Sequence, residues 1–291
     1  MTRLQLGTAQ WGQGYGVTNA VGRLSEEAIA DIVAVAREWD IDSVDTAMGS
    51  TAGQYGDAQA RLRPFAHDFA ITTKVAGAED VTEQVLAAQR QLGVDRLHAV
   101  LVHDWDALDD DDRRRAVRSL GRLLDSHGIV RAGVSVYDEA GVSSAIETFA
   151  SRRCPLTAVQ VPANLLDRRL ERSAPLIHLH QQGAEIVVRS AFLQGVLLAA
   201  SSLPGSAESL ANHPDVRAYR DWCLESDPSV SLASACLSHV RALPWATHVV
   251  VGVTSSMELT EICEAWHEHG PKLAPDSLGS SDLNLIDPRR W

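Results

Sequence analysis

The stretch SEEAIADIVAVAREWDIDSVDTA, from Ser25 to Ala47, joins a helix pattern directly to a strand pattern. Apolar residues from Ile29 to Ala36 fall at i, i+3, i+4 and i+7, which places them on one face of a helix. Ser25 precedes this run and is a natural N-cap. A short apolar segment then ends at Asp45. The stretch therefore predicts one helix followed by one buried strand.

Short apolar runs of the same kind recur along the chain. They are Leu4–Leu6, Ser43–Val44, Phe69–Thr72, Ala99–Val102, Val130–Val134, Ala158–Val161, Ile186–Val188 and Thr247–Val251. From the second to the seventh, the runs begin roughly 30 residues apart, the length of a strand–helix unit. They lack polar alternation, as expected of parallel strands buried on both faces. The pattern predicts a closed (β/α)8 barrel formed as a single domain by residues 1–291.

A doubly wound open sheet is the alternative architecture. Such a sheet usually carries GxGxxG after its first strand, where this chain has LGTAQWGQGYG. The GQGYG segment resembles a phosphate loop only in composition, because it lacks the lysine of a P-loop. The segment 206–243 is too long for one helix, and we expect two helices there.

Composition narrows the class of protein. A net charge of −12 argues against nucleic acid or an anionic membrane as the main partner. No apolar run is long enough to span a membrane, and the N-terminus lacks a signal core, so we expect a cytoplasmic protein. The four cysteines are widely spaced and are expected to be reduced thiols. The HLH and HEH segments lack carboxylate or cysteine complements, so no metal site is expected.

Ionisable residues follow three neighbouring strands. The second predicted strand ends at Asp45, the third at Lys74 and the fourth at His103. Each alone has a structural explanation: a helix cap, a snorkelling lysine and a satisfied core histidine. In a (β/α)8 barrel, however, chemistry takes place at the C-terminal ends of the strands. Three such residues at matching positions predict one active site.

Further motifs occur in a characteristic order. LGTAQ, DTA, YG, TTK and LVHDW are followed by GVSVYD, VQVPANLLDRR, VVRSAFLQG and VVVGVTSS, and the chain closes with LIDPRRW. In the order and spacing of these motifs the chain resembles the aldo-keto reductase superfamily, and in its LGTAQ start and LIDPRRW-like tail a bacterial subgroup of it. The resemblance implies nicotinamide-dependent reduction of a carbonyl to an alcohol.

The resemblance assigns the catalytic roles to Asp45, Tyr55, Lys74 and His103. The tyrosine would give its proton to the carbonyl oxygen. Because a free phenol has a pKa of about 10, it needs a neighbouring cation to act as an acid at neutral pH. Lys74 would supply that cation and Asp45 would keep the lysine charged. His103 would hydrogen-bond the carbonyl oxygen and orient it.

The proton donor has two candidate positions. In the family the tyrosine follows the aspartate more closely, at the position that Ser50 holds here. In the family this tyrosine belongs to the start of the helix that follows. The segment YGDAQARL preserves that helix start around Tyr55. A loop insertion is tolerated because closure entropy rises slowly with length. We therefore expect Tyr55, and not Ser50, to be the donor.

The resemblance also implies a binding site for the dinucleotide. Arg189 holds the position where many members have a tyrosine stacked on the nicotinamide, and an arginine plane can also stack. Trp11 and Trp105 are candidates for the substrate-pocket wall, with ordinary packing as the alternative. The implied cofactor-binding residues are Gly7, Thr8, Asp45, Ser135, Gln160, Arg189, Ser190, Phe192, Gly195, Gly252, Ser255, Ser256 and Glu261.

The choice between NADPH and NADH depends on charge after the last strand. Members that select NADPH grip its 2′-phosphate with basic residues there, whereas this chain has Gly252 and Glu258. A glutamate repels a phosphate, and no charge-assisted pair replaces the lost one. The family favours NADPH, with NADH as the alternative. We expect a weak NADPH preference, unless Arg241 or Lys272 supplies the cation.

Two other functions remain open. The chain could be a nicotinamide-binding regulatory or partner subunit, or a non-redox lyase or epimerase that reuses Lys74 and His103. A tyrosine in place favours the reductase. The expected substrate is a small carbonyl compound: an aldehyde, a ketone or a keto-sugar-like biosynthetic intermediate. The oligomeric state is left open.

Overall fold

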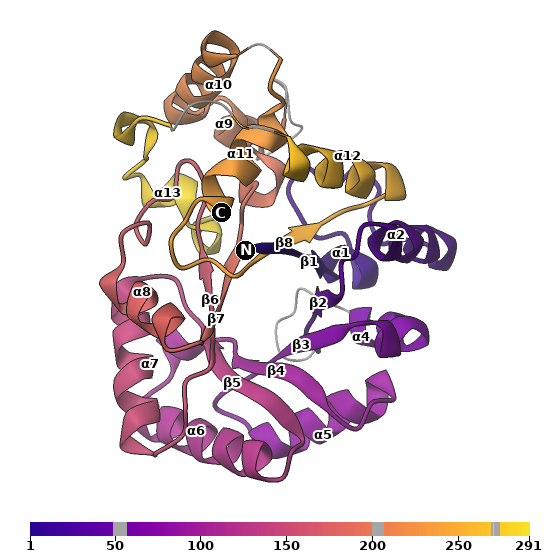
Figure 1. Ribbon diagram of the computed structural model, residues 1–291, viewed down its shortest axis with the longest axis vertical. Coiled ribbons are helices and arrows are strands. Elements are labelled where there is room, and N and C mark those ends of the chain that lie inside the picture. Colours follow the sequence, from indigo (N-terminus) through magenta and orange to yellow (C-terminus); the bar gives the residue numbers. More distant parts are fainter. Residues whose placement is uncertain (49–56, 200–206, 228, 269, 271–273) are drawn as a thin grey trace.

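The computed structural model describes residues 1–48, 57–199, 207–227, 229–268, 270 and 274–291. In this part of the chain, eight parallel strands close into a barrel in sequential order, and helices surround it (Figure 1). The predicted (β/α)8 fold is confirmed. The strands are β1 Arg3–Gly7, β2 Ser43–Asp45, β3 Ala70–Val75, β4 Leu97–Val102, β5 Ile129–Ser135, β6 Ala158–Pro162, β7 Glu185–Arg189 and β8 His248–Gly252.

Capping residues mark where helices begin and end. The Ser25 hydroxyl accepts a hydrogen bond from the Ala28 amide at the start of α2, as the sequence predicted. Helix α5 ends at Gly93, whose φ of 74° is left-handed. The principal helices are α1 Ala9–Gly12, α2 Glu26–Glu38, α4 Ala58–Leu62, α5 Val81–Leu92, α6 Asp110–Asp125, α7 Glu139–Ser151, α8 Ala174–Gln181, α12 Ser256–His267 and α13 Leu283–Ile286.

The segment after β7 differs from the prediction of two helices. Its described part holds three: α9 Ala207–Ala211, α10 Pro214–Ser226 and α11 Leu232–Arg241. Pro214 starts α10, and the residue before a proline avoids the helical region, so His213 is extended with ψ 140°. This break separates the short α9 from α10.

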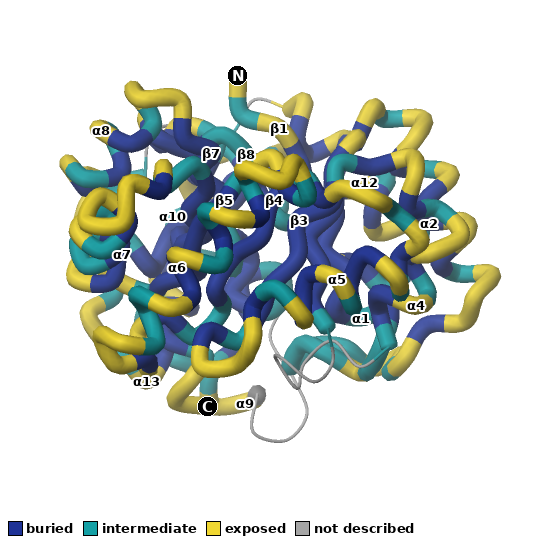
Figure 2. Tube along the Cα trace, turned by 90° about the horizontal axis from the view of Figure 1, so that it is seen from below, coloured by how far each residue is buried: buried dark blue, intermediate teal, exposed yellow. Residues whose placement is uncertain are grey.

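Strand register sets the level of the barrel mouth. Gly7 of β1 is paired with Asp45 of β2 on one side and with Gly252 of β8 on the other. The three strands therefore end at the same height. The strands form the buried centre of the molecule, and the exposed residues lie mostly on the surrounding helices and loops (Figure 2). The N-terminus lies on one side of the barrel, and α9, α13 and the C-terminus lie on the other (Figure 2).

All four cysteines are buried and none forms a disulfide. No helix in the described residues has both the length and the apolar character needed to cross a membrane.

Candidate active site

A cavity of about 510 Å³ lies at the C-terminal ends of the strands. Its inner end is formed by residues within two positions of those strand ends, so the closed barrel brings together residues that are far apart in sequence. These residues are Gly7, Asp45, Lys74, His103, Ser135, Gln160, Arg189 and Gly252.

Asp45 and Lys74 form a buried ion pair at the floor of this end. The Lys74 ammonium donates to Asp45 Oδ1 at 2.6 Å and to Oδ2 at 2.5 Å, and only 2% and 4% of the two side chains are exposed. Gln160 Nε2 also donates to Asp45 Oδ1, at 3.0 Å. Burial lowers the pKa of Lys74, while the Asp45 carboxylate opposes that change. The pair is therefore fixed by β2, β3 and β6.

His103 lies just beyond β4, where its backbone amide donates to Val75 O at 2.9 Å. The half-buried ring lines the cavity. Burial, followed by the charges of Lys74 and Arg189, lowers the pKa of His103 to about 4. The imidazole is therefore neutral at neutral pH and can both donate and accept a hydrogen bond.

Tyr55 and Ser50 lie outside the described residues, so the assignment of the proton donor stays a prediction. The helix that follows is described. Gln59 of α4 is buried, and its Nε2 donates to Thr73 Oγ1 of β3 at 2.6 Å. This bond fixes the start of α4 beside the strand that carries Lys74.

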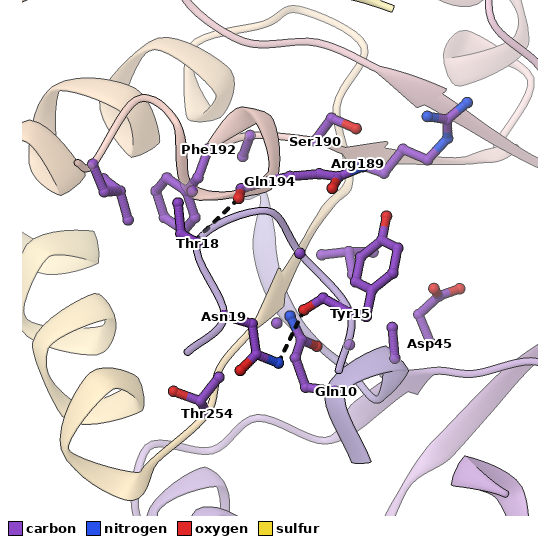
Figure 3. A pocket seen from close by; sticks show the side chains of 18 of the residues that line it. Gln10, Tyr15, Thr18, Asn19, Asp45, Arg189, Ser190, Phe192, Gln194 and Thr254 are labelled. Carbon is purple, nitrogen blue, oxygen red and sulfur yellow. Dashed lines mark hydrogen bonds between the residues drawn. The ribbon is translucent and has the colours of Figure 1, made fainter. Parts of the chain in front are cut away.

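Tyr15 is a cavity residue that sequence reasoning missed. It lies in the loop between α1 and α2, and Figure 3 shows its ring between the side chains of Arg189 and Asp45. Burial raises the pKa of Tyr15, and Arg189 partly opposes this. The tyrosine belongs to the GQGYG segment, which as a loop carries no periodicity from which its direction could have been predicted.

The same loop is tied to the segment after β7. Thr18 Oγ1 donates to Gln194 O at 3.2 Å (Figure 3). The two segments touch so closely that a Cβ at Gly195, where φ is 91°, would come within 2.0 Å of Thr18 Oγ1. The loop therefore forms one wall of the cavity.

Arg189 and Tyr137 form another wall. The guanidinium of Arg189 lies 3.9 Å from the Tyr137 ring centroid, and that of Arg289 lies 3.6 Å from it. Two guanidinium groups cannot share one ring face at these distances, so Tyr137 lies between them. Arg289 is held by Asp287 through contacts of 2.9 and 2.6 Å. The C-terminal segment thereby fixes a side chain in the cavity wall.

The outer end of the cavity is formed at the start of α12. Glu258 accepts from the Thr254 amide at 2.6 Å and from Thr254 Oγ1 at 2.9 Å. The Glu258 amide in turn donates to Ser255 Oγ at 3.1 Å. The Thr254 and Glu258 amides at the start of α12 are thus already hydrogen-bonded to side chains of the same segment. Glu261 also lines this end.

Two residues, Arg241 and Lys272, were candidates for the cation that would bind the 2′-phosphate. Arg241 hydrogen-bonds the Trp266 carbonyl and lies over the Trp266 ring, and it does not line the described cavity. Lys272 lies outside the described residues. Among the described lining residues, Lys74 and Arg189 are the cations, and both belong to the inner end.

Two buried side-chain oxygens without a hydrogen-bond partner among the described residues, together with the lack of a side chain at Gly252, are compatible with a bound dinucleotide. Gln160 Oε1 and Gln10 Oε1 are buried and have no hydrogen-bond partner in the described structure. A Cβ at Gly252 would come within 2.6 Å of the Gln10 side-chain amide, so the Gln10 side chain would have to move if this position carried one. A carboxamide N–H group at Gln160 would satisfy its oxygen. The residues present therefore fit a nicotinamide cofactor.

Some predicted residues do not line the cavity. Thr8 is buried and its hydroxyl donates to Asp45 O at 3.2 Å. Trp11 and Trp105 are fully buried in the core, and Trp105 Nε1 donates to Ser144 Oγ at 2.8 Å. Ser255 and Ser256 are also absent from the described lining. Lining residues not proposed from the sequence include Ala9, Gln10, Tyr15, Gly16, Thr18, Asn19, Tyr137, Gln194, Leu198, Thr254 and Ile262.

The barrel, with ionisable groups gathered at the C-terminal ends of its strands, has the arrangement of a barrel enzyme. A model of the aldo/keto reductase family matches residues 3–274, and the chain belongs to this family. A search of the curated proteins gives no match.

Solved structures share the fold. The apo form of the aldo-keto reductase AKR11C1 from Bacillus halodurans aligns over 100% of both chains with 20% identity and a TM-score of 0.71. Its holo form aligns over 92% of this chain and 87% of that one, with the same identity and TM-score. A Pseudomonas aeruginosa protein assigned to the aldo-keto reductases aligns over 90% and 88%, with 21% identity and a TM-score of 0.65. At this identity the likeness shows the fold alone.

Proposed function

We propose that the protein is a nicotinamide-dependent oxidoreductase that reduces the carbonyl of an aldehyde, a ketone or a keto-sugar-like intermediate to an alcohol. The main support is the buried Lys74–Asp45 pair beside a neutral His103 in one cavity. Family membership agrees with this reaction class. When bound, the nicotinamide supplies the hydride that reaches the carbonyl carbon.

The chain's own residues would manage the proton and the carbonyl. Tyr55 gives its proton to the carbonyl oxygen, and the Lys74 ammonium stabilises the phenolate that remains. Asp45 keeps Lys74 charged and in place, because the pair is held by contacts of 2.5 and 2.6 Å. Neutral His103 donates a hydrogen bond to the carbonyl oxygen, which fixes its direction for reduction.

The cofactor would lie along the cavity from β5 to α12. Gln160 and Ser135 bind the carboxamide, a role supported by the unpartnered Gln160 oxygen. Gly7 flanks the nicotinamide side, supported by the buried Thr8, whose hydroxyl donates to Asp45 O, and Arg189 borders the ring. Ser190, Phe192 and Gly195 follow the pyrophosphate, and Gly252 and Glu261 follow the adenosine; Ser255 and Ser256 stand behind this end, at the start of α12.

The charges at the outer end argue that any preference for NADPH is weak and that NADH is also accepted. Glu258 already occupies donors at the start of α12, where a 2′-phosphate could otherwise bind. Both Glu258 and Glu261 would repel that phosphate, whereas a carboxylate accepts a hydrogen bond from the free ribose 2′-hydroxyl of NADH.

Fluorescence titration tests the proposal at its first step. Purified protein is titrated with NADH and with NADPH, and a panel of aldehydes, ketones and keto-sugars is then added while cofactor absorbance is followed. We expect binding of at least one cofactor and turnover of some members of the panel. Binding without turnover would instead identify a nicotinamide-binding partner subunit or a redox-neutral enzyme, and absence of binding would contradict the proposal.

A further inference from the structure

The inner end of the cavity carries one positive charge without a counter-ion in the described structure. The Lys74 ammonium is matched by the Asp45 carboxylate, and His103 is neutral at neutral pH. Arg189 is half-buried and forms no ion pair with a described carboxylate; its hydrogen bond goes to the Val136 carbonyl at 3.3 Å. A partly buried cation is stabilised when an anion binds beside it.

The guanidinium of Arg189 is held ready for such an anion. Its plane lies against Tyr137, whose other face is covered by Arg289. Arg289 is itself anchored to Asp287. A guanidinium has five N–H donors, of which one bond is described here, so most of the fork is left for a ligand. Less rotamer entropy is lost on binding when the fork is already fixed.

Tyr15 supplies a neutral donor on the facing wall. Its ring lies between Arg189 and Asp45 (Figure 3), and burial keeps its phenol protonated by raising its pKa. A phenol O–H near a guanidinium suits an anionic oxygen better than a neutral group, because hydrogen bonds to a charged acceptor are stronger. Arg189 also contributes to the lowered pKa values of His103 and Lys74, so the anion site adjoins the proposed reaction centre.

We propose that the substrate carries a carboxylate or phosphate group, which binds Arg189 and Tyr15 while its carbonyl lies at Lys74 and His103. This inference rests on the proposed carbonyl reduction. It names the substrate class for the same site: an acidic aldehyde or ketone, in which the anion is not the reacting group. The stack of Arg289, Tyr137 and Arg189 acts to position the guanidinium.

Matched substrate pairs test the inference on the holoenzyme with saturating cofactor. Succinic semialdehyde is compared with butanal, and glyceraldehyde 3-phosphate with glyceraldehyde. Charge-assisted hydrogen bonds predict kcat/KM values about 10- to 100-fold higher for the anionic member. Discrimination in the first pair alone assigns a carboxylate, and in the second alone a phosphate. Equal kcat/KM values in both pairs would mean that Arg189 serves the cofactor, and would overturn the inference.

Variants test whether the preference for anionic substrates depends on Arg189. Arg189→Gln should bring the ratio within each pair close to one, and Arg189→Lys should keep part of it because the charge remains without the fork. The matched control is Arg37→Gln, which also removes a guanidinium over an aromatic ring, that of Phe65, but lies away from the cavity; its ratio should stay as in the wild type. A ratio preserved in Arg189→Gln would contradict the assignment.

Binding of succinate and of inorganic phosphate gives a readout that needs no turnover. Calorimetry on the cofactor-saturated wild type should detect binding of at least one anion, weakened by added salt and lost in Arg189→Gln. If no carbonyl is reduced but this anion binding is found, the proposed function fails and the anion site stands. If carbonyls are reduced but neither anion binds, the anion site fails and the reductase stands.

Discussion

The two ends of the cavity differ in burial and in charge. The inner end is formed by strand ends and holds the buried Asp45–Lys74 pair with the half-buried Arg189. The outer end is formed at the start of α12, where Glu258 and Glu261 are exposed. A charge removed from a buried pair leaves its partner in a poorly solvated place, whereas an exposed charge is screened by water. Chemistry is therefore expected to depend steeply on the inner end, and cofactor choice more gently on the outer end.

The largest effect is expected for Lys74→Met. Activity should fall about 10²- to 10⁴-fold, because the proposed proton donor loses its cation. Unfolding should be easier by about 3 to 5 kcal/mol, because Asp45 is left buried without its ammonium partner. Cofactor binding should be largely kept, since it depends on β5 to α12. Steady-state kinetics, denaturant unfolding and fluorescence titration measure the three quantities.

A double variant separates chemistry from stability in that experiment. Asp45→Asn combined with Lys74→Met removes both charges, so it should regain stability without regaining activity. Equal loss of activity and of cofactor binding in the single variant would assign Lys74 to the fold or to the cofactor site instead.

The next largest effect concerns the proton donor. Tyr55→Phe should abolish carbonyl reduction, whereas Ser50→Ala should leave most of it. Tyr15→Phe is a useful third variant: it keeps the ring in the wall and should weaken anionic substrates without abolishing reduction of neutral ones. Initial rates with one anionic and one neutral carbonyl distinguish the three. Loss in Ser50→Ala with retention in Tyr55→Phe would mean that the two positions were aligned wrongly.

A smaller effect should appear in the pH dependence of stability. Because the pKa of His103 is lowered to about 4, the folded protein leaves it neutral while the unfolded chain takes up a proton below about 6.5. Stability therefore falls as the pH drops from 7 towards 4. Histidine NMR should give a pKa near 4 for His103, and His103→Gln should flatten the stability profile. A pKa near the ordinary value would show that the ring is solvated.

The smallest effect is expected at the exposed outer end. Glu258→Gln should shift the ratio of NADPH to NADH affinity towards NADPH by about 3- to 10-fold, because a screened repulsion is removed. Glu264→Gln on the same helix lies outside the described cavity and serves as the control. A strong wild-type preference for NADPH that survives replacement of both Arg241 and Lys272 would contradict this account of cofactor choice.

Sequence reasoning worked best where a strand determines the position of a side chain. Asp45, Lys74 and His103 could be brought together from sequence, because the closed barrel aligns the ends of β2, β3 and β4. Apolar runs identified the strands because most strand residues are buried in the barrel. The number of helices after β7 was wrong because Pro214 breaks that segment.

Loop residues could not be found in the same way. Tyr15 faces the cavity because its loop is tied to Gln194 through Thr18, a contact between residues 176 positions apart. Tyr137 is held by Arg289 from the C-terminal segment. Neither contact leaves a periodic signal in the sequence. Trp11 and Trp105 were pocket-wall candidates, but their large apolar rings lie in the core.

The most direct test of the central claim is hydride transfer itself. The protein is incubated with NADH or NADPH deuterated at the transferring face of C4 and with a carbonyl from the panel, and the product alcohol is analysed by mass spectrometry and NMR. The account predicts one deuterium on the carbinol carbon, formed by the wild type and nearly absent with Lys74→Met. Cofactor binding with no deuterium in any product would contradict carbonyl reduction at this site.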